Sequence, residues 1–310
     1  MTPGPRVPTV SITVVLHNSA EHLEACLASI APAVRAGWAE LIAVDNASPD
    51  QSAAIVRAQL PEATVITTDR NLGFAAGANC GLQKATGELW LLFNPDVIVP
   101  DGGLRTLVDW MRRHPELGAA SPELHEPGGA WSSPGRAFPS ILRTLAETAR
   151  LHRLLSPRDR GRIFRGPYWP GGDQLRAGWV PGTTMLIRPG AIRDVGPLRE
   201  DLFMYGEDIE LCWRLRRHGW QIGVCAATSF THHESSSARV SFGDDATLRR
   251  VVAGIDGACR IMYGSAHARV LAAATALSLA AEAAAPDRTA PHRRTARTHA
   301  QLWWARARIA

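Results

Sequence analysis

Lysine is nearly absent from this 310-residue chain. Lys84 is the only lysine among 34 basic residues, so the net charge of +5 comes almost entirely from arginine. The arginines are spread along the chain and are not gathered into one stripe interleaved with aromatic residues. Such a stripe is the usual mark of a nucleic-acid-binding protein. No nucleic-acid partner is therefore predicted.

Cysteine is also sparse, and its pattern excludes two kinds of site. The five cysteines are scattered, odd in number and never spaced as Cys-x-x-Cys. This argues against structural zinc and against a disulfide framework, and it predicts reduced thiols in a cytoplasmic setting. The N-terminal residues contain no apolar segment typical of a signal peptide. No apolar run reaches the ~18 residues that a membrane-spanning helix needs.

Strands and helices alternate in the first third of the chain. Apolar runs rich in β-branched residues predict four strands, at residues 9–16, 40–45, 63–67 and 88–93. Helices are predicted after each of the first three strands. Continuous apolar strands in this alternation are typical of a mostly parallel sheet covered on both faces, so the predicted fold class is α/β.

The regular pattern is interrupted between residues 121 and 177. This stretch is rich in proline, glycine and arginine, and only a short helix near residues 141–155 is predicted within it. Strand and helix patterns return at residues 179–188, 208–218 and from 221 onward, and the chain after Thr247 is predicted to be helical. A long irregular segment in a compact domain is usually functional or mobile.

The fourth predicted strand ends abruptly in Asn94-Pro95-Asp96. Parallel α/β sheets place their sites at the carboxyl ends of strands. Carboxylate and amide oxygens suit hard cations such as Mg²⁺ and Mn²⁺. The motif therefore predicts a cation site, with an Asx-Pro turn that caps the next helix as the alternative.

Two further polar segments follow strands. Asp45 ends the second strand, where its carboxylate would accept hydrogen bonds from a nucleobase or a ribose, or would cap the next helix. Residues 70–79, RNLGFAAGAN, form a glycine-punctuated loop that enters a helix. Gly73 and Gly77 allow close approach of the backbone, and the helix N-terminus and Arg70 favour a phosphate. The alternative for this loop is a tight strand-to-helix turn.

Acids and histidines mark the later part of the chain. Glu207 and Asp208 lie at the start of a predicted helix, where acids commonly complement the helix dipole. A carboxylate is also the group that deprotonates an acceptor hydroxyl in sugar transfer. His232 and His233 follow a strand and would point to opposite sides of an extended chain, so one of them is a candidate metal ligand.

In their order along the chain, these motifs resemble those of the inverting family 2 glycosyltransferases of the GT-A fold, and within that family the rhamnosyltransferase-like branch. The resemblance covers about residues 10–237 and rests on VVLHNS, VDNAS, RNLGFAAGAN, LLFNPDV, WVPGTTMLIR, GEDIELCWRLRRHGW and HHESSS. Where the family carries Asp-x-Asp, this chain has Asn94 in the first position.

The resemblance implies roles residue by residue. Asp208 matches the general base, with Glu207 as its neighbour. Asp96 matches the main ligand of Mg²⁺ or Mn²⁺, joined by Asn94 and by His233 or His232. The residues expected to bind the nucleotide-sugar are Asn18, Asp45, Asn46, Arg70, Asn71, Gly73, Phe74, Gly77, Asn79, Asn94 and Asp96, and those expected at the acceptor are Trp179, Gly182 and Thr183.

The expected activity is that of an inverting hexosyltransferase that moves a sugar such as rhamnose from a dTDP- or UDP-sugar. The acceptor would be a glycan, a lipid-linked molecule or a natural product, as in bacterial cell-wall or polysaccharide synthesis. A non-catalytic relative that only binds a sugar nucleotide is one alternative, favoured by Asn94. A sugar nucleotidyltransferase is less favoured, because LHNSAEHL follows the first strand in place of a glycine- and arginine-rich loop.

The predicted organisation is a GT-A domain at residues 9–245 with an addition at each end. A disordered N-terminus at residues 1–8 precedes it. Residues 9–121 are expected to form the nucleotide-binding half, and residues 122–245 the acceptor and catalytic half. Residues 246–310 are expected to form a helical C-terminal extension with a basic tail.

Two arginine-rich segments are candidates for contact with lipid. The segment 121–177 is where acceptor recognition is expected, and its arginines would meet a polyprenyl diphosphate or an anionic lipid, or would simply be solvated. The tail's arginines and Trp303-Trp304 are compatible with peripheral attachment at the inner face of the cell membrane. The apolar stretch 270–281 is too short to span and is expected to pack within the protein or in a homodimer.

Overall fold

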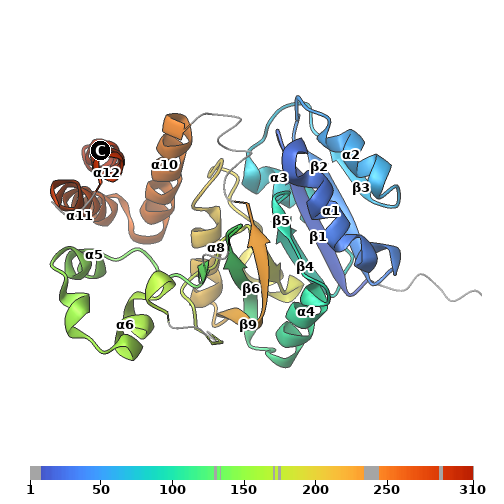
Figure 1. Ribbon diagram of the computed structural model, residues 1–310, viewed down its shortest axis with the longest axis horizontal. Helices are drawn as coiled ribbons and strands as arrows, with labels where there is room; N and C mark the ends of the chain where they lie inside the picture. The colour runs from blue at the N-terminus through green and yellow to red at the C-terminus, as the bar shows by residue number, and fades with distance from the viewer. Residues whose placement is uncertain are drawn as a thin grey trace, which may run out of the picture.

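The predicted α/β architecture is confirmed: a central sheet carries helices on both faces (Figure 1). The computed structural model describes residues 8–128, 131–132, 134–169, 172–173, 176–233, 244–285 and 289–309. Residues 1–7 of the expected disordered N-terminus lie outside the described residues.

The strands are β1 (Val10–Leu16), β2 (Ala39–Asp45), β3 (Thr64–Thr67), β4 (Leu89–Phe93), β5 (Val97–Ile98), β6 (Leu117–His125), β7 (Trp131–Ser132), β8 (Thr184–Ile187) and β9 (Gln221–His232). The helices are α1 (Ala20–Arg35), α2 (Ser52–Gln59), α3 (Phe74–Leu82), α4 (Gly103–Arg113), α5 (Ile141–Thr148), α6 (Pro157–Phe164), α7 (Pro189–Val195), α8 (Glu207–Arg217), α10 (Asp244–Tyr263), α11 (Ser265–Ala284) and α12 (Ala290–Ala307). Two short 3₁₀ helices are η1 (Leu151–Leu154) and η2 (Gly166–Tyr168).

The strand order brings the predicted motifs to one edge of the sheet. The order is β3-β2-β1-β4-β8-β6-β9-β5, with β7 paired to β6. Strands β3, β2, β1 and β4 are parallel, and β8 runs antiparallel to its neighbours β4 and β6. The carboxyl ends of β1, β2 and β4 therefore meet, which is where α/β sheets hold their ligands.

Alternating side chains of the strands divide the core into two layers. On β1, Ile12 and Val14 belong to the layer that contains buried residues of α1, α2 and α4. Thr13 and Val15 point to the other face, where they lie under α3. Buried residues of α3, α7 and α8 form the second layer. Because both faces are covered, the strands read as continuous apolar runs.

Residues 121–177 are less irregular than expected. β6 continues to His125, and α5, η1, α6 and η2 follow it. Pro122 is accommodated in β6 because the pairing with β9 shifts register between Pro122 and Glu123, so the missing N–H interrupts no regular ladder. Since β6 crosses the expected boundary at residues 121–122, the two expected halves share one sheet.

The C-terminal helices pack on the protein and on one another. α11 contacts α12, α10 and α5, so the apolar stretch 270–281 lies in a packed helix. Trp303 of the expected membrane-binding tail is buried in a cluster with residues of α10 and α11. The buried carboxylate of Asp256 accepts hydrogen bonds from Arg260 (2.8 Å) and Arg306 (3.0 Å), which ties α12 to α10. No helix in the described residues combines the length and apolarity needed to cross a membrane.

Helix α10 braces the loop that precedes α8. A Cβ atom on Gly254 would lie 2.0 Å from the carbonyl oxygen of Tyr205, and one on Gly206 would lie 2.4 Å from the carbonyl oxygen of Gly254. Gly206 also adopts a φ of 93°, a conformation that favours glycine. The two glycines therefore allow backbone-to-backbone contact between α10 and the start of α8.

We expect Gly254→Ala to lower the free energy of unfolding by about 1–3 kcal/mol, because the added methyl group would displace backbone atoms. Denaturant unfolding followed by circular dichroism measures this. Gly257→Ala on the same helix is the control, since its Cβ would meet only a terminal methyl of Leu202, at 3.0 Å. Alanine also favours a helix over glycine. An equal loss of stability in both variants would contradict the proposed brace.

Candidate active site

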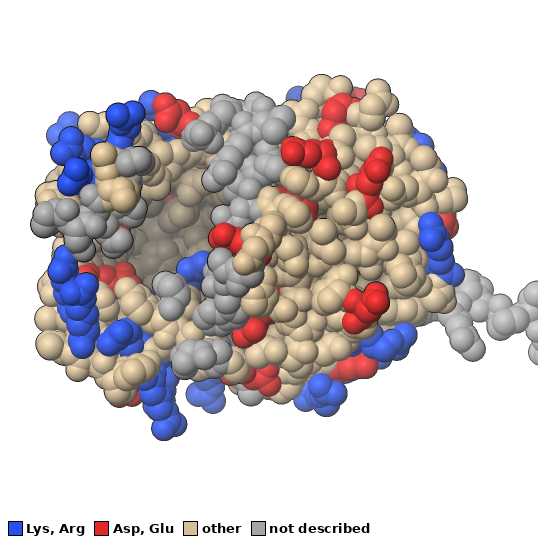
Figure 2. Space-filling view, viewed as in Figure 1, with Lys and Arg blue, Asp and Glu red and all other residues tan. Residues whose placement is uncertain are grey.

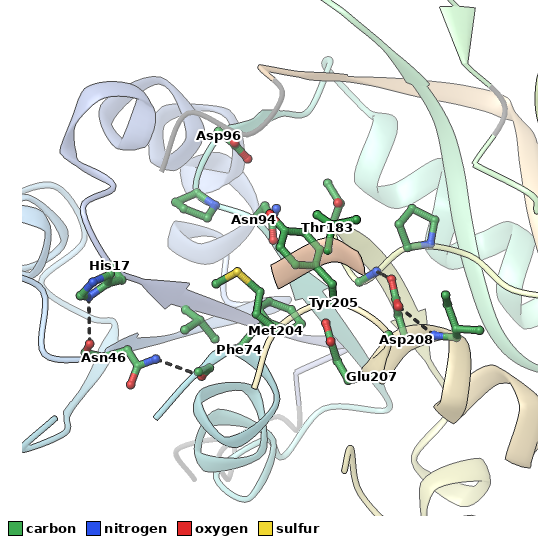
Figure 3. A pocket seen from close by; sticks show the side chains of 18 of the residues that line it. His17, Asn46, Phe74, Asn94, Asp96, Thr183, Met204, Tyr205, Glu207 and Asp208 are labelled. Carbon is green, nitrogen blue, oxygen red and sulfur yellow. Dashed lines mark hydrogen bonds between the residues drawn. The ribbon is translucent and has the colours of Figure 1, made fainter. Parts of the chain in front are cut away.

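A cavity of about 380 Å³ opens at the carboxyl ends of β1, β2 and β4. Its walls come from the loops after these strands, the glycine-rich loop before α3, the segment before β8, the start of α8 and one side of α10. Figure 3 shows side chains from these elements around the cavity. The sheet topology therefore brings together motifs that are far apart in the sequence.

The acid pair at the start of α8 lies in this cavity. Asp208 Oδ2 accepts a hydrogen bond from the N–H of Gly182 (3.1 Å), and Asp208 Oδ1 accepts one from the N–H of Ile209 (2.8 Å) (Figure 3). Glu207 is 4% exposed, and its Oε2 atom has no hydrogen-bond partner in the described part of the chain. The two adjacent carboxyl groups thus have very different surroundings.

These surroundings decide which carboxyl group holds a proton. Burial raises the pKa of Glu207 well above its ordinary value, and the charge of Asp208 raises it further. Burial also raises the pKa of Asp208, but the backbone N–H groups of Gly182 and Ile209 oppose that rise. Hydrogen bonds donated to a carboxylate stabilise its ionised form. Asp208 is therefore the more readily ionised member of the pair, and Glu207 holds a proton more tightly.

Asp96 and His232 face each other at the end of β4. Asp96 Oδ1 lies 3.3 Å from His232 Nε2, and both atoms are buried without a hydrogen-bond partner among the described residues. The carbonyl oxygen of Asp96 accepts the N–H of His233, which fixes the loop against β9. A carboxylate oxygen and an imidazole nitrogen that face each other in this way fit a divalent cation such as Mg²⁺ or Mn²⁺.

The other expected metal ligands differ in position. Asn94 lines the cavity, and its backbone N–H donates to the carbonyl oxygen of Thr183 (2.9 Å). The ring of His233 stacks on His22, with 4.8 Å between the ring centroids, whereas the ring of His232 faces Asp96. Within the described ranges, no group of three or more His, Cys, Asp and Glu side chains is placed so that it could hold a metal ion. Residues 234–237 of the HHESSS segment lie outside the described residues.

Asn46 organises the glycine-rich loop. Its side-chain Nδ2 donates to the carbonyl oxygen of Gly73 (3.0 Å), and its Oδ1 accepts the N–H of Leu72 (2.8 Å). Gly73 has a φ of 85°, and a Cβ there would lie 2.2 Å from the carbonyl oxygen of Phe203. That same carbonyl oxygen accepts the N–H of Phe74 (2.7 Å). Asn46 is thus a positioning residue for this wall of the cavity.

A model of the glycosyl transferase family 2 matches residues 11–154. The chain is a family 2 glycosyltransferase. The glycosyltransferase is 28% identical over 255 residues to the N-acetylglucosaminyl-diphospho-decaprenol L-rhamnosyltransferase of Mycobacterium tuberculosis. The aligned residues cover 74% of this chain and 77% of that protein. As a member of this family it transfers a sugar from a nucleotide-sugar.

Solved structures confirm the expected GT-A fold. The mannosyltransferase PcManGT of Pyrobaculum calidifontis, in complex with GDP-Man and Mn²⁺, has a TM-score of 0.54 at 18% identity, over 97% of this chain and 86% of that one. S. aureus TarS 1–349 in complex with UDP has a TM-score of 0.50 at 16% identity, over 96% of this chain and 90% of that one.

Most of the predicted site residues of the glycosyltransferase share the cavity. Those that line it are Asn46, Asn71, Gly73, Phe74, Asn94, Asp96, Trp179, Gly182, Thr183, Glu207, Asp208 and His232. Those that do not are Asn18, Asp45, Arg70, Gly77, Asn79 and His233.

Local contacts explain several residues outside the cavity. Asn79 is buried, and its side chain bonds to the backbone of Leu198 and to Glu200, so its amide joins α3 to the segment after α7. Gly77 lets α3 approach β1, because a Cβ there would lie 2.9 Å from Val15 Cγ1. Asp45 accepts the N–H of Ser48 (2.9 Å), which shapes the turn after β2. The side chain of Arg70 is exposed.

His17, Met204 and Tyr205 are among the cavity residues that the sequence interpretation missed. His17 lies within hydrogen-bonding distance of the carbonyl oxygen of Asn46 (3.1 Å), and Met204 and Tyr205 come from the loop before α8. Tyr205 has a φ of 67°, which is unusual for a bulky residue and typical of strain kept at a functional site. A left-handed conformation before Gly206-Glu207 leaves no signal in the residue types.

Proposed function

We propose that this family 2 glycosyltransferase is an inverting hexosyltransferase that uses a dTDP- or UDP-sugar. The observation that carries the proposal is the position of Asp208, whose carboxylate accepts two backbone N–H groups and lies in the same cavity as Asn94 and Asp96. A base and a diphosphate site on one cavity are the two requirements of a direct displacement at the anomeric carbon.

Asp208 would act as the general base. It accepts the proton of the acceptor hydroxyl while that oxygen forms its bond to the anomeric carbon. The bond from that carbon to the diphosphate oxygen breaks on the opposite side, and the electron pair leaves with the diphosphate. A single displacement of this kind inverts the anomeric configuration. Glu207, in its neutral form, adds no second charge beside the base.

Asp96, His232 and Asn94 are the residues that would hold Mg²⁺ or Mn²⁺. A divalent cation at this position would offset the charge that builds on the departing diphosphate. Asn46 and Gly73 shape the wall expected to receive the nucleotide. Trp179, Gly182 and Thr183 line the same cavity, where Gly182 donates to Asp208, and they are proposed to meet the acceptor.

The relatives support finer assignments of the substrates. The M. tuberculosis relative is named for L-rhamnose transfer to a diphospho-decaprenol-linked sugar, and one structural neighbour holds GDP-Man with Mn²⁺. We therefore propose rhamnose as the first sugar to test and a lipid-linked glycan as the first acceptor.

We expect calorimetry with a panel of dTDP-, UDP- and GDP-sugars to show metal-dependent binding of one donor. The physical reason is that Asp96 Oδ1 and His232 Nε2 face each other without a hydrogen-bond partner among the described residues, so a cation would bind both together with the diphosphate. Each titration is repeated with Mn²⁺ and with a chelator. Binding of no donor by folded protein would contradict the proposal. Binding without donor hydrolysis or transfer would favour a protein that only binds sugar nucleotides.

A further inference from the structure

A second cavity of about 630 Å³ lies between α5, η1 and α11. Figure 2 shows the molecule hollowed between the C-terminal helices and the part of the chain that carries α5 and α6, with basic side chains at the rim. None of the residues given a role in the reaction lines it, apart from Trp179. The proposed reaction therefore assigns no ligand to this cavity.

Positive charge is concentrated in this second cavity. Four arginines line it, Arg136, Arg143, Arg150 and Arg153, against the two acids Glu147 and Glu282. The guanidinium groups of Arg150 and Arg153 have no hydrogen bond or ion pair within the described ranges. Arg150 also adopts a left-handed φ of 57°, which is uncommon outside glycine. The cavity is thus lined by more cationic than anionic side chains.

The surroundings lower the pKa of two further groups in the cavity. Burial lowers the pKa of the Arg143 guanidinium. Burial and three neighbouring arginines lower the pKa of His152, whose Nδ1 atom is buried without a partner among the described residues. An anion placed among these groups would relieve their mutual repulsion and accept hydrogen bonds from them.

Exposed leucines lie on the same elements as the arginines. Leu142 on α5 is 79% exposed and Leu154 on η1 is 82% exposed, while Leu145, Leu151 and Ile163 are also exposed. α5 and η1 bury none of their residues. Apolar side chains next to arginines, on short helices at the surface, are typical of a segment that lies in a lipid interface.

The second cavity adjoins the acceptor side of the first one. Trp179 lines both cavities. Its carbonyl oxygen accepts the N–H of Arg136 (2.9 Å), and its own N–H donates back to Arg136 (3.1 Å). Gly182, which donates to Asp208, follows three residues later, so the two Cα atoms are at most about 11 Å apart. One molecule could therefore reach from the second cavity to the base.

We propose that the second cavity binds the diphosphate group of a lipid-linked acceptor, and that the exposed leucines enter the lipid surface that carries it. This inference rests on the proposed function in taking the acceptor to be lipid-linked. The acceptor sugar would extend past Trp179 to Asp208, while the hydrocarbon chain stays in the membrane. The arginine-rich segment is then a substrate site, and the C-terminal tail, with Trp303 buried, is not needed for attachment.

The test compares vesicles that carry equal negative charge from two sources. Phosphatidylcholine vesicles contain either phosphatidylglycerol or a polyisoprenyl diphosphate, and binding of the full chain is measured by sedimentation. We expect the protein to prefer the diphosphate vesicles by about tenfold. Arg150→Gln/Arg153→Gln should lose that preference, since each basic residue near the lipid contributes to binding. Arg57→Gln/Lys84→Gln removes the same charge from exposed positions on or beside α2 and α3 and should keep it.

A second pair of measurements separates the headgroup from the lipid surface. Leu142→Ser/Leu154→Ser should weaken binding to vesicles but leave binding of inorganic pyrophosphate, measured by calorimetry without divalent cation, unchanged. Both leucines are exposed, so unfolding curves should match the parent protein. Equal binding of the parent protein to both kinds of vesicle would overturn the proposal. An equal loss of preference in Arg150→Gln/Arg153→Gln and in the control Arg57→Gln/Lys84→Gln would overturn it too.

The vesicle experiment tests the second cavity independently of the donor site. Donor binding in the absence of vesicles tests the proposed function alone. Donor binding with no preference for diphosphate lipid would overturn this inference and leave the proposed function standing. Preference for diphosphate lipid without donor binding would support the second cavity as a lipid-diphosphate site and contradict the proposed transfer reaction.

Discussion

Asp208→Asn is expected to lower the rate of sugar transfer by about 10²–10⁴-fold, the usual contribution of a positioned general base. The amide can still occupy the place beside Gly182 and Ile209, but it cannot take a proton from the acceptor. Donor affinity should change little, because the diphosphate side of the cavity is built from other residues. Steady-state kinetics with the acceptor, combined with donor calorimetry, measures both quantities.

Glu207→Gln is the matched control for this experiment. Glu207 is adjacent, buried and lines the same cavity, yet burial and the charge of Asp208 raise its pKa and favour its neutral form. Glutamine reproduces that neutral group, so the variant should keep most of the activity. Similar losses in both variants would contradict the assignment of Asp208 as the sole base.

The pH profile gives a second check on the same pair. Transfer requires ionised Asp208, and burial raises the pKa of this group above the ordinary aspartate value. kcat/KM should therefore fall as the pH is lowered through a pKa that is higher than that of a solvated aspartate. Glu207→Gln should leave this acidic limb in place, because no charge is removed. A large shift of the limb in Glu207→Gln would show that Glu207 is ionised near the working pH.

Asp96→Ala is expected to weaken metal-dependent donor binding by at least about a hundredfold. A divalent cation supplies several kcal/mol of charge stabilisation at a diphosphate, and each 1.36 kcal/mol corresponds to a factor of ten. The measurement is donor calorimetry with and without Mn²⁺. Metal-independent binding should be equally weak in the parent protein and the variant. Unchanged Mn²⁺ dependence would exclude Asp96 as the ligand.

The two adjacent histidines provide a control that does not alter Asp96. His232 Nε2 lies 3.3 Å from Asp96 Oδ1, whereas His233 stacks on His22. His232→Ala should reduce the Mn²⁺ dependence of donor binding, and His233→Ala should preserve it. The reverse result would mean that the loop rearranges when donor and metal bind.

The strands and the acids at their ends could be predicted from the sequence. β1, β2 and β4 are continuous apolar runs because both faces of the sheet are covered, and such runs are visible without a structure. Asp96 and Asp208 stand where an apolar strand ends and where a helix begins, positions that topology brings to one edge. The α/β fold and the core of the site follow from these two signals.

Other site features depend on packing that a single sequence does not record. Gly73 and Gly77 look alike in a glycine-rich loop, but one approaches the carbonyl oxygen of Phe203 and the other the side chain of Val15. Asn79 has the same chemistry as Asn71, yet its amide binds a distant backbone. The conformation of Tyr205 and the contribution of α10 arise only when distant segments meet.

The close contact between Gly254 and the carbonyl oxygen of Tyr205 also limits how this enzyme can be recombined with its relatives. The family match ends at residue 154, but the loop that sets the position of Asp208 is shaped against a helix near the other end of the chain. A hybrid that exchanged α10 without the loop Leu202–Gly206 would pair surfaces that were not formed for each other. These two segments have to be transplanted as one unit, whatever donor or acceptor the hybrid is meant to use.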